Sequence, residues 1–334
     1  MIYDTERILL GHADPQDNDS LDEKGGGMSR SSRSWMVFAL LEGLTKTVSA
    51  WLSKLLGLTS KTAAGSVVAT LVIGVVQCLA GLTGGLVRNK AFFKPEHILS
   101  AAFFGTFATA MTLLGLLAYE WGGDMAVVTF IIASSIVPGA IVDAVVFKNR
   151  LQPQQKLGLV TFLLSGWAML GFPNLAQLAH LPRWVWPAVG IALLAVANEA
   201  ITQKLAIGKG KNQADPMVNN FWVGLTTVAW ALVLIGYGKL AGWDFAISAR
   251  YLAVSGAIGL VVVCMIALKL LSYQGGGTIA FKKFLMFGTY LAGASLVGLL
   301  LYGEAVSLGK IVGLVGFVLT FALMDKATWA ALRS

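Results

Sequence analysis

The chain of 334 residues is 56% hydrophobic and only 13% charged, with a mean hydropathy of +0.73, whereas soluble domains carry roughly 25% charged residues. A soluble protein of this composition could not cover its own surface, so the composition predicts an all-α polytopic membrane protein. The net charge of +8 comes from Lys and Arg that lie between apolar runs, which indicates membrane topology rather than nucleic-acid binding. Two Cys and three scattered His exclude a disulfide framework and a metal cluster, and no cofactor is expected.

Residues 1–33 form the first predicted segment. They carry many acidic and basic side chains and end near the tract Gly25-Gly26-Gly27, without the apolar core of a secretory signal. This composition is typical of a disordered tail. We expect the tail to be a cytoplasmic, solvated extension, with a gating role as the alternative.

From Ser34 onward, apolar runs of about twenty residues alternate with short polar joints, which is the length needed to cross a hydrocarbon core of about 30 Å. The pattern predicts ten transmembrane helices at approximately 35–56, 65–87, 97–119, 125–147, 156–172, 185–205, 216–236, 248–271, 280–303 and 309–325.

The distribution of positive charge supports this topology. With the N-terminus inside, sixteen Lys and Arg fall on the cytoplasmic side, Lys269, Lys282 and Lys283 among them, against six on the outer side. This is the asymmetry expected for an inner or plasma membrane protein. Both termini are therefore predicted to be cytoplasmic.

The chain also matches itself. GLVTFLLSGWAM from Gly158 and GLVGFVLTFALM from Gly313 are identical at six of twelve positions. FALLEGLTKTVSAWL and IALLAVANEAITQKL align through a shared Ala-Leu-Leu, which sets Lys46 on Glu199. We interpret the chain as two five-helix repeats, 34–173 and 174–334. Because five is odd, the second repeat is inverted in the membrane, as in secondary transporters.

These features resemble the EamA-type transporters of the drug/metabolite transporter superfamily, whose repeats carry a Pro in the fourth span, a Glu at its end and a Gly opening the fifth. Pro138 and Gly158 match in the first half, and Glu304 and Gly313 match in the second. Asn149 replaces the Glu of the first half, and Gly293 replaces the Pro of the second. The resemblance implies a central cavity lined by spans one to four and six to nine, with spans five and ten at the periphery or at a homodimer interface.

Charged residues inside apolar spans need a partner, a wet cavity or a function, because each costs roughly 2.5 to 3.5 kcal/mol at a helix centre. The candidates are Glu42, Lys46, Asp143 and Glu199. Lys46 either pairs with Glu42 one turn away or faces Glu199 across the repeat axis. In the second case Glu199 would carry the coupling or substrate-recognition charge, with Lys46 as its balancing partner. Asp143 either binds substrate or pairs with Lys148 and Arg150 at the interface.

Uncharged residues within the spans extend this candidate site. Polar and aromatic side chains suited to small organic substrates are Gln77, Asn198, Asn219, Trp222 and Tyr290, with helix packing as the alternative role of each. Pro138 and Gly139, and the small residues around Gly293, favour a bend or a close approach in spans four and nine. Glu304 lies at the outer end of span nine as a solvated cap or as a brace to span ten.

The function that fits these observations is secondary active transport of a small organic metabolite, such as an amino acid or an organic cation, by alternating access, with export as the expected direction. No G-x-x-x-x-G-K-[ST] sequence occurs, so ATP hydrolysis does not supply the energy. Paired catalytic side chains are absent, which argues against an intramembrane enzyme. The alternative is a lipid-handling or structural membrane subunit. The expected partners are the lipid bilayer and the substrate.

Overall fold

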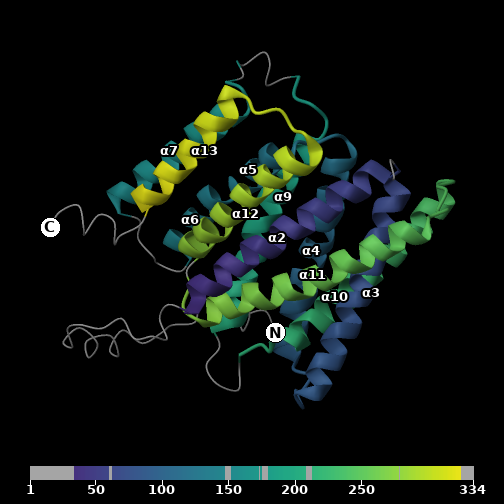
Figure 1. The fold of residues 1–334 in the computed structure, drawn as a ribbon. Coiled ribbons are helices and arrows are strands. Elements are labelled where there is room, and N and C mark those ends of the chain that lie inside the picture. The colour runs from purple at the N-terminus through teal and green to yellow at the C-terminus, as the bar shows by residue number, and fades with distance from the viewer. Residues whose placement is uncertain are drawn as a thin grey trace, which may run out of the picture.

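The computed structural model describes residues 34–59, 62–146, 152–172, 174, 180–207, 213–277 and 279–324, except for a few side chains within helices, that of Asp143 among them. This part of the chain is all-helical and contains no strand (Figure 1). The helices are α2 (Ser34–Thr59), α3 (Ala63–Val87), α4 (Pro95–Glu120), α5 (Met125–Ala133), α6 (Ile136–Val145), α7 (Pro153–Met169), α9 (Val185–Ile207), α10 (Pro216–Leu240), α11 (Ala249–Gln274), α12 (Ile279–Tyr302) and α13 (Leu308–Met324).

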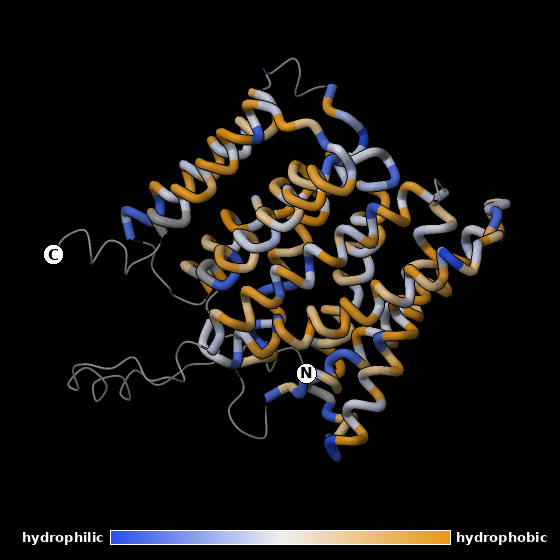
Figure 2. Tube along the Cα trace, viewed as in Figure 1, coloured by the Kyte–Doolittle hydropathy of each residue, from blue (hydrophilic) through white to orange (hydrophobic). Residues whose placement is uncertain are grey.

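Seven helical segments within the described residues are long and apolar enough to cross a membrane. They are 63–87, 101–120, 125–142, 185–206, 216–240, 249–274 and 282–302. Hydrophobic residues predominate along the helices, as the colours of Figure 2 show. Many large apolar side chains are exposed at the surface, and those of Leu240 and Leu300 are 91% and 74% exposed. A surface of this kind suits lipid rather than water. The prediction that this is a helical integral membrane protein is confirmed, without the number of spans.

The remaining predicted spans correspond to α2, α7 and α13. Helix α2 carries Glu42, Lys46 and Lys54, while α7 and α13 have 17 residues each. At about 1.5 Å per residue, 17 helical residues extend about 26 Å, slightly less than the hydrocarbon core. The prediction of ten spans therefore exceeds the seven segments of the described residues that are long and apolar enough to cross a membrane.

The fourth predicted span is broken into α5 and α6. The break lies at Ser134 and Ser135, three to four residues before Pro138. Pro138 has no backbone N–H to donate to the carbonyl of Ser134, and its ring crowds that carbonyl, which interrupts the helix. The predicted bend in this span is confirmed.

Helices distant in sequence pack together in pairs. Helix α3 packs on α10, α2 on α11 and α12, α4 on α9 and α10, and α12 on α5 and α6. Glycines allow helices to approach closely, including α2 and α4, which also pack together. A Cβ atom placed on Gly57 of α2 would lie 2.8 Å from the backbone nitrogen of Glu120 in α4, so only glycine fits there. Through these crossings and the contacts of α9 with α11 and α12, the helices α2, α9, α11 and α12 form one group of neighbours.

Helices α7 and α13 form a pair at one side of the molecule, with few contacts to the other helices (Figure 1). Gly313 faces the carbonyl oxygen of Ser165, 2.8 Å from where its Cβ would lie, so α13 approaches the backbone of α7 closely. Gly158 is buried in α7. The two glycines of the repeated sequence therefore belong to the same peripheral helix pair.

Candidate functional site

Five charged side chains are buried in the described part of the molecule, each with 6% exposure or less. They are Glu42, Glu199, Lys269, Lys282 and Lys283. They come from four helices, α2, α9, α11 and α12, that meet at one end of the bundle. Charges buried this deeply are costly unless they are paired, so their partners determine what this cluster can do.

Three lysines and two glutamates form a continuous row of ion pairs, which we call the ion-pair chain. Lys46 Nζ lies 3.3 Å from a Glu42 carboxylate oxygen, and the other Glu42 oxygen lies 2.7 Å from Lys282 Nζ. Lys282 also lies 3.1 Å from Glu199, whose second oxygen is 3.1 Å from Lys269. The order is therefore Lys46, Glu42, Lys282, Glu199 and Lys269, with a lysine at each end.

Neutral groups complete the surroundings of the chain. The Tyr273 hydroxyl donates to Glu199, and Lys269 donates to the side-chain oxygen of Asn198. Each lysine of the chain also lies near an aromatic ring, such as that of Phe104, whose centroid is 5.0 Å from Lys269 Nζ. The corresponding distances are 5.3 Å from Lys46 to Phe287 and 4.7 Å from Lys282 to Tyr273. Cation–π contacts of this kind attract an ammonium group to the face of the ring.

Lys283, the neighbour of Lys282, points elsewhere. Its amine donates to the backbone carbonyl of Ser135 at 3.2 Å and to the Ser135 hydroxyl at 3.0 Å. Ser135 lies at the break between α5 and α6. Lys283 thus fastens α12 to the broken helix and is not part of the ion-pair chain.

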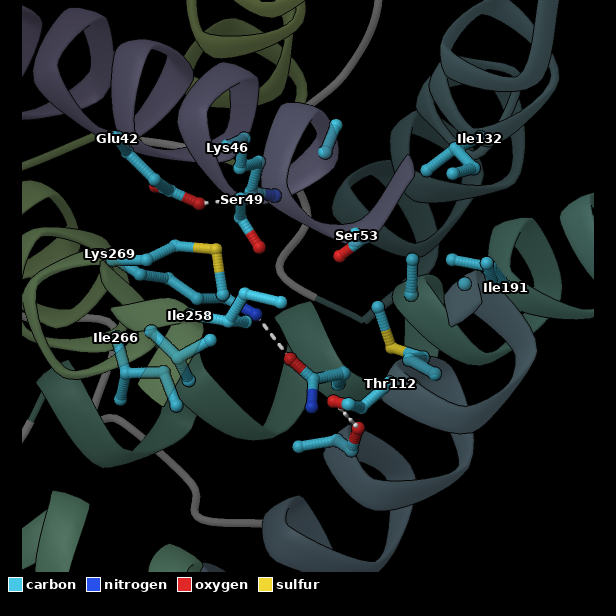
Figure 3. Close-up of a pocket in the computed structure, with 18 of the residues that line it drawn as sticks. Glu42, Lys46, Ser49, Ser53, Thr112, Ile132, Ile191, Ile258, Ile266 and Lys269 are labelled. Carbon is cyan, nitrogen blue, oxygen red and sulfur yellow. Dashed lines mark hydrogen bonds and ion pairs between the residues drawn. The ribbon is translucent and has the colours of Figure 1, made fainter. Parts of the chain in front are cut away.

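A cavity of about 170 Å³ adjoins the ion-pair chain (Figure 3). Both end lysines, Lys46 and Lys269, border it, whereas Lys282 does not. Ser49 and Ser53 point into it from α2, and Ile132 and Ile191 border it from the other side. Most of its remaining wall is aliphatic or aromatic. The cavity is thus charged at one end and mainly apolar elsewhere.

The structure brings most of the predicted site residues to this cavity. Those that border it are Glu42, Lys46, Gln77, Asn198, Glu199 and Tyr290. Gln77 also donates to Asn220 at 3.1 Å, a buried contact between α3 and α10. The side chain of Asp143 lies outside the described residues.

Two predicted residues lie away from this cavity. The Trp222 indole donates to the carbonyl of Phe92 at 2.8 Å, so it ties α10 to the segment before α4. Asn219 is buried in α10 without a hydrogen-bond partner among the described residues. Neither belongs to the cavity wall.

The direct pairing of Lys46 with Glu199 does not occur. Lys46 pairs with Glu42, one turn earlier on α2, which is the simpler of the two sequence interpretations. Glu199 instead pairs with Lys269 and Lys282. The reason is geometric, because α11 and α12 bring two amines closer to Glu199 than α2 brings Lys46.

Sequence reasoning missed Lys269, Lys282 and Lys283, which it assigned to the cytoplasmic interface. All three are instead buried within helices. One signal was available. Lys269 lies five residues before the end of α11, deeper than an interfacial lysine needs to be.

Glu304 is neither a solvated cap nor a brace to span ten. Its carboxylate accepts hydrogen bonds from Lys54 of α2 and, at 2.8 Å, from the backbone N–H of Met125 at the start of α5. Its side chain is 10% exposed. Glu304 therefore braces the end of α12 against α2 and α5, at the opposite end of α2 from Glu42.

The described residues contain no group of His, Cys, Asp or Glu able to hold a metal ion. No family model and no curated protein matches the chain. The fold is similar to that of a solved chain described as "Crystal structure of protein", with a TM-score of 0.63 and 16% sequence identity. The match covers 87% of this chain and 98% of that one, which is among 28 matching solved chains. At this identity the similarity concerns the fold alone.

Proposed function

We propose that the protein is a secondary active transporter of a small organic metabolite, working by alternating access. The observation that carries this proposal is the cavity between helices of the two sequence halves, with the ion-pair chain across one end. Lys46 and Glu42 come from the first half, and Glu199, Lys269 and Lys282 come from the second. Contacts that link two halves through breakable ion pairs suit a gate.

The helix contacts support two inverted five-helix repeats. In that scheme α2, α3, α4, the broken α5–α6 and α7 correspond to α9, α10, α11, α12 and α13. The packing of α2 on α11 then corresponds to that of α9 on α4, and the packing of α2 on α12 to that of α9 on α5. Exchanging the two halves converts the α3–α10 pair into itself, and the same holds for the α7–α13 pair. A ten-helix transporter of the EamA type fits this pattern, with α7 and α13 at the periphery.

The shape of the cavity supports one closed end. Glu42 lies early in α2, whereas Ser53, Gly115 and Ile191 lie toward the opposite ends of α2, α4 and α9. The cavity therefore extends from the ion-pair chain toward the far side of the bundle. If the N-terminus is cytoplasmic, as proposed from the charge distribution, the closed end faces the cytoplasm.

Blocking the cavity tests the proposal. A Cβ atom on Gly115 would meet nothing closer than 3.8 Å, so Gly115→Phe places a ring in the cavity without a backbone clash. Gly256→Phe is the matched control, because a Cβ there meets no atom within 4 Å and Gly256 does not border the cavity. The purified protein would be reconstituted into proteoliposomes, and these would be loaded with a labelled pool of small metabolites.

The expected result is protein-dependent exchange of at least one labelled solute that Gly115→Phe abolishes and Gly256→Phe retains. If no solute exchanges faster than in protein-free liposomes, the transport proposal is wrong. Phospholipid translocation without solute exchange would instead favour the lipid-handling alternative.

A further inference from the structure

We propose that the solute is a small organic anion whose charged group binds between the amines of Lys46 and Lys269, with its apolar part in the rest of the cavity. This inference rests on the proposed transport function for its biological meaning. The binding site itself follows from the charges, and it can be tested without a transport assay.

The first argument is the charge of the ion-pair chain. The three lysines of the ion-pair chain carry three positive charges, and its two glutamates carry two negative charges. The ion-pair chain therefore has a net charge of +1. This sum leaves out Lys283, which bonds to Ser135 instead. A buried excess charge is unfavourable unless a counter-charge neutralises it. A bound monovalent anion would bring the ion-pair chain to neutrality, whereas a bound monovalent cation would raise its net charge to +2.

The second argument is the order of the charges. Each carboxylate is shared by two amines: Glu42 by Lys46 and Lys282, and Glu199 by Lys269 and Lys282. Lys282 has two carboxylates and lies behind the cavity wall. The end lysines have one carboxylate each and border the cavity. An ammonium group has three N–H donors, so the end lysines retain the capacity to bind a further acceptor.

The third argument is accessibility. The side chain of Lys46 is 18% exposed, while those of Glu42 and Lys282 are fully buried and that of Glu199 is 3% exposed. The charged group of the chain that a solute in the cavity meets most readily is therefore an amine. A cationic solute would have to compete with two lysines for either carboxylate.

The fourth argument is the apolar remainder of the cavity. Its wall includes Ile132, Ile191, Ile258 and Val262, and its volume is about 170 Å³. Pockets for drug-sized ligands are typically about 300 Å³ or larger. This cavity suits a compact solute with one anionic end and a short apolar body, such as a small carboxylate.

The test compares three compounds of nearly equal size that differ in charge: butyrate, butyramide and butylammonium. Each is titrated against purified full-length protein at constant ionic strength made up with sodium chloride, and the unfolding temperature is recorded. A ligand that binds only the folded state raises this temperature by mass action. We expect butyrate to raise it, with saturation, and the other two compounds to have little effect.

Variants locate the site. Lys46→Gln and Lys269→Gln should each weaken butyrate binding by about tenfold or more, because each removes a charged hydrogen-bond donor. Lys204→Gln is the control, since Lys204 is exposed at the end of α9 and lies outside the cavity. It should bind butyrate as the parent does. If a lysine variant fails to fold, the comparison of the three compounds on the parent protein still decides.

Two results would overturn the inference: stabilisation by butylammonium or butyramide equal to that by butyrate, or butyrate binding that neither lysine variant weakens. Solute exchange in proteoliposomes is measured separately. Exchange without selective butyrate binding would reject the anion site and leave the transport proposal standing. Butyrate binding at the two lysines without exchange of any solute would support the anion site and reject the transport proposal.

Discussion

Removing the charge of Glu199 is the most direct test of the ion-pair chain. Glu199→Gln keeps the shape of the side chain but leaves Lys269 without a carboxylate, with Asn198 as its remaining polar partner. At an effective dielectric constant of about 20, each lost pair at 3.1 Å corresponds to about 5 kcal/mol of attraction. Much of this is offset, because the variant no longer buries a carboxylate. Breaking a buried ion pair by removing one partner typically costs about 3 to 5 kcal/mol, which is the destabilisation we expect.

The measurement is the free energy of unfolding in detergent micelles, from denaturant titrations of the parent and the variant. Lys204→Gln, at an exposed position of the same helix, should stay within about 0.5 kcal/mol of the parent. The double variant Glu199→Gln/Lys269→Gln should lose less than the sum of the single variants, because the second change removes the amine left unpaired by the first. A Glu199→Gln protein as stable as the Lys204→Gln control would refute the reasoning.

Three further predictions concern packing and topology. Gly57→Ala should destabilise the protein by about 1 to 3 kcal/mol in the same unfolding assay, because its methyl group would meet the backbone of α4, whereas Gly256→Ala should not destabilise it. Gly313→Leu should separate α13 from Ser165 of α7, detectable as loss of a disulfide engineered between these helices, while leaving butyrate binding intact. A reporter fused after Lys211 should behave as cytoplasmic in an accessibility assay; export of the reporter would contradict the ten-span topology.

The membrane class and most helix positions could be predicted from composition and from runs of apolar residues, because the lipid environment requires long apolar helices. The broken helix could be predicted as well, since Pro138 acts through its own backbone. The tail at 1–33 lies outside the described residues and stays a prediction.

The partners of the buried charges could not be predicted in the same way. Glu42 and Lys46 are one turn apart on α2, so their pairing follows from helix geometry. Lys282 reaches Glu42 and Glu199 only because α2, α9 and α12 meet, and this depends on tertiary packing. The rule that lysines near helix ends mark the cytoplasmic side also led to the prediction that Lys269 lies at the interface, although its side chain is buried. A charge pattern alone does not distinguish an interfacial amine from one that turns inward.

Helices α2 and α12 are joined at both ends. Lys282 holds α12 to Glu42 near one end, and Glu304, just beyond the other end of α12, holds it to Lys54. Separating either end of α12 from α2 therefore requires that the ion pair at that end break. If one of these ion pairs broke while the other held, the intact pair would keep the two helices together at its own end. In the proposed transport cycle, the relative strength of these two distant salt bridges would determine at which end α2 and α12 separate first.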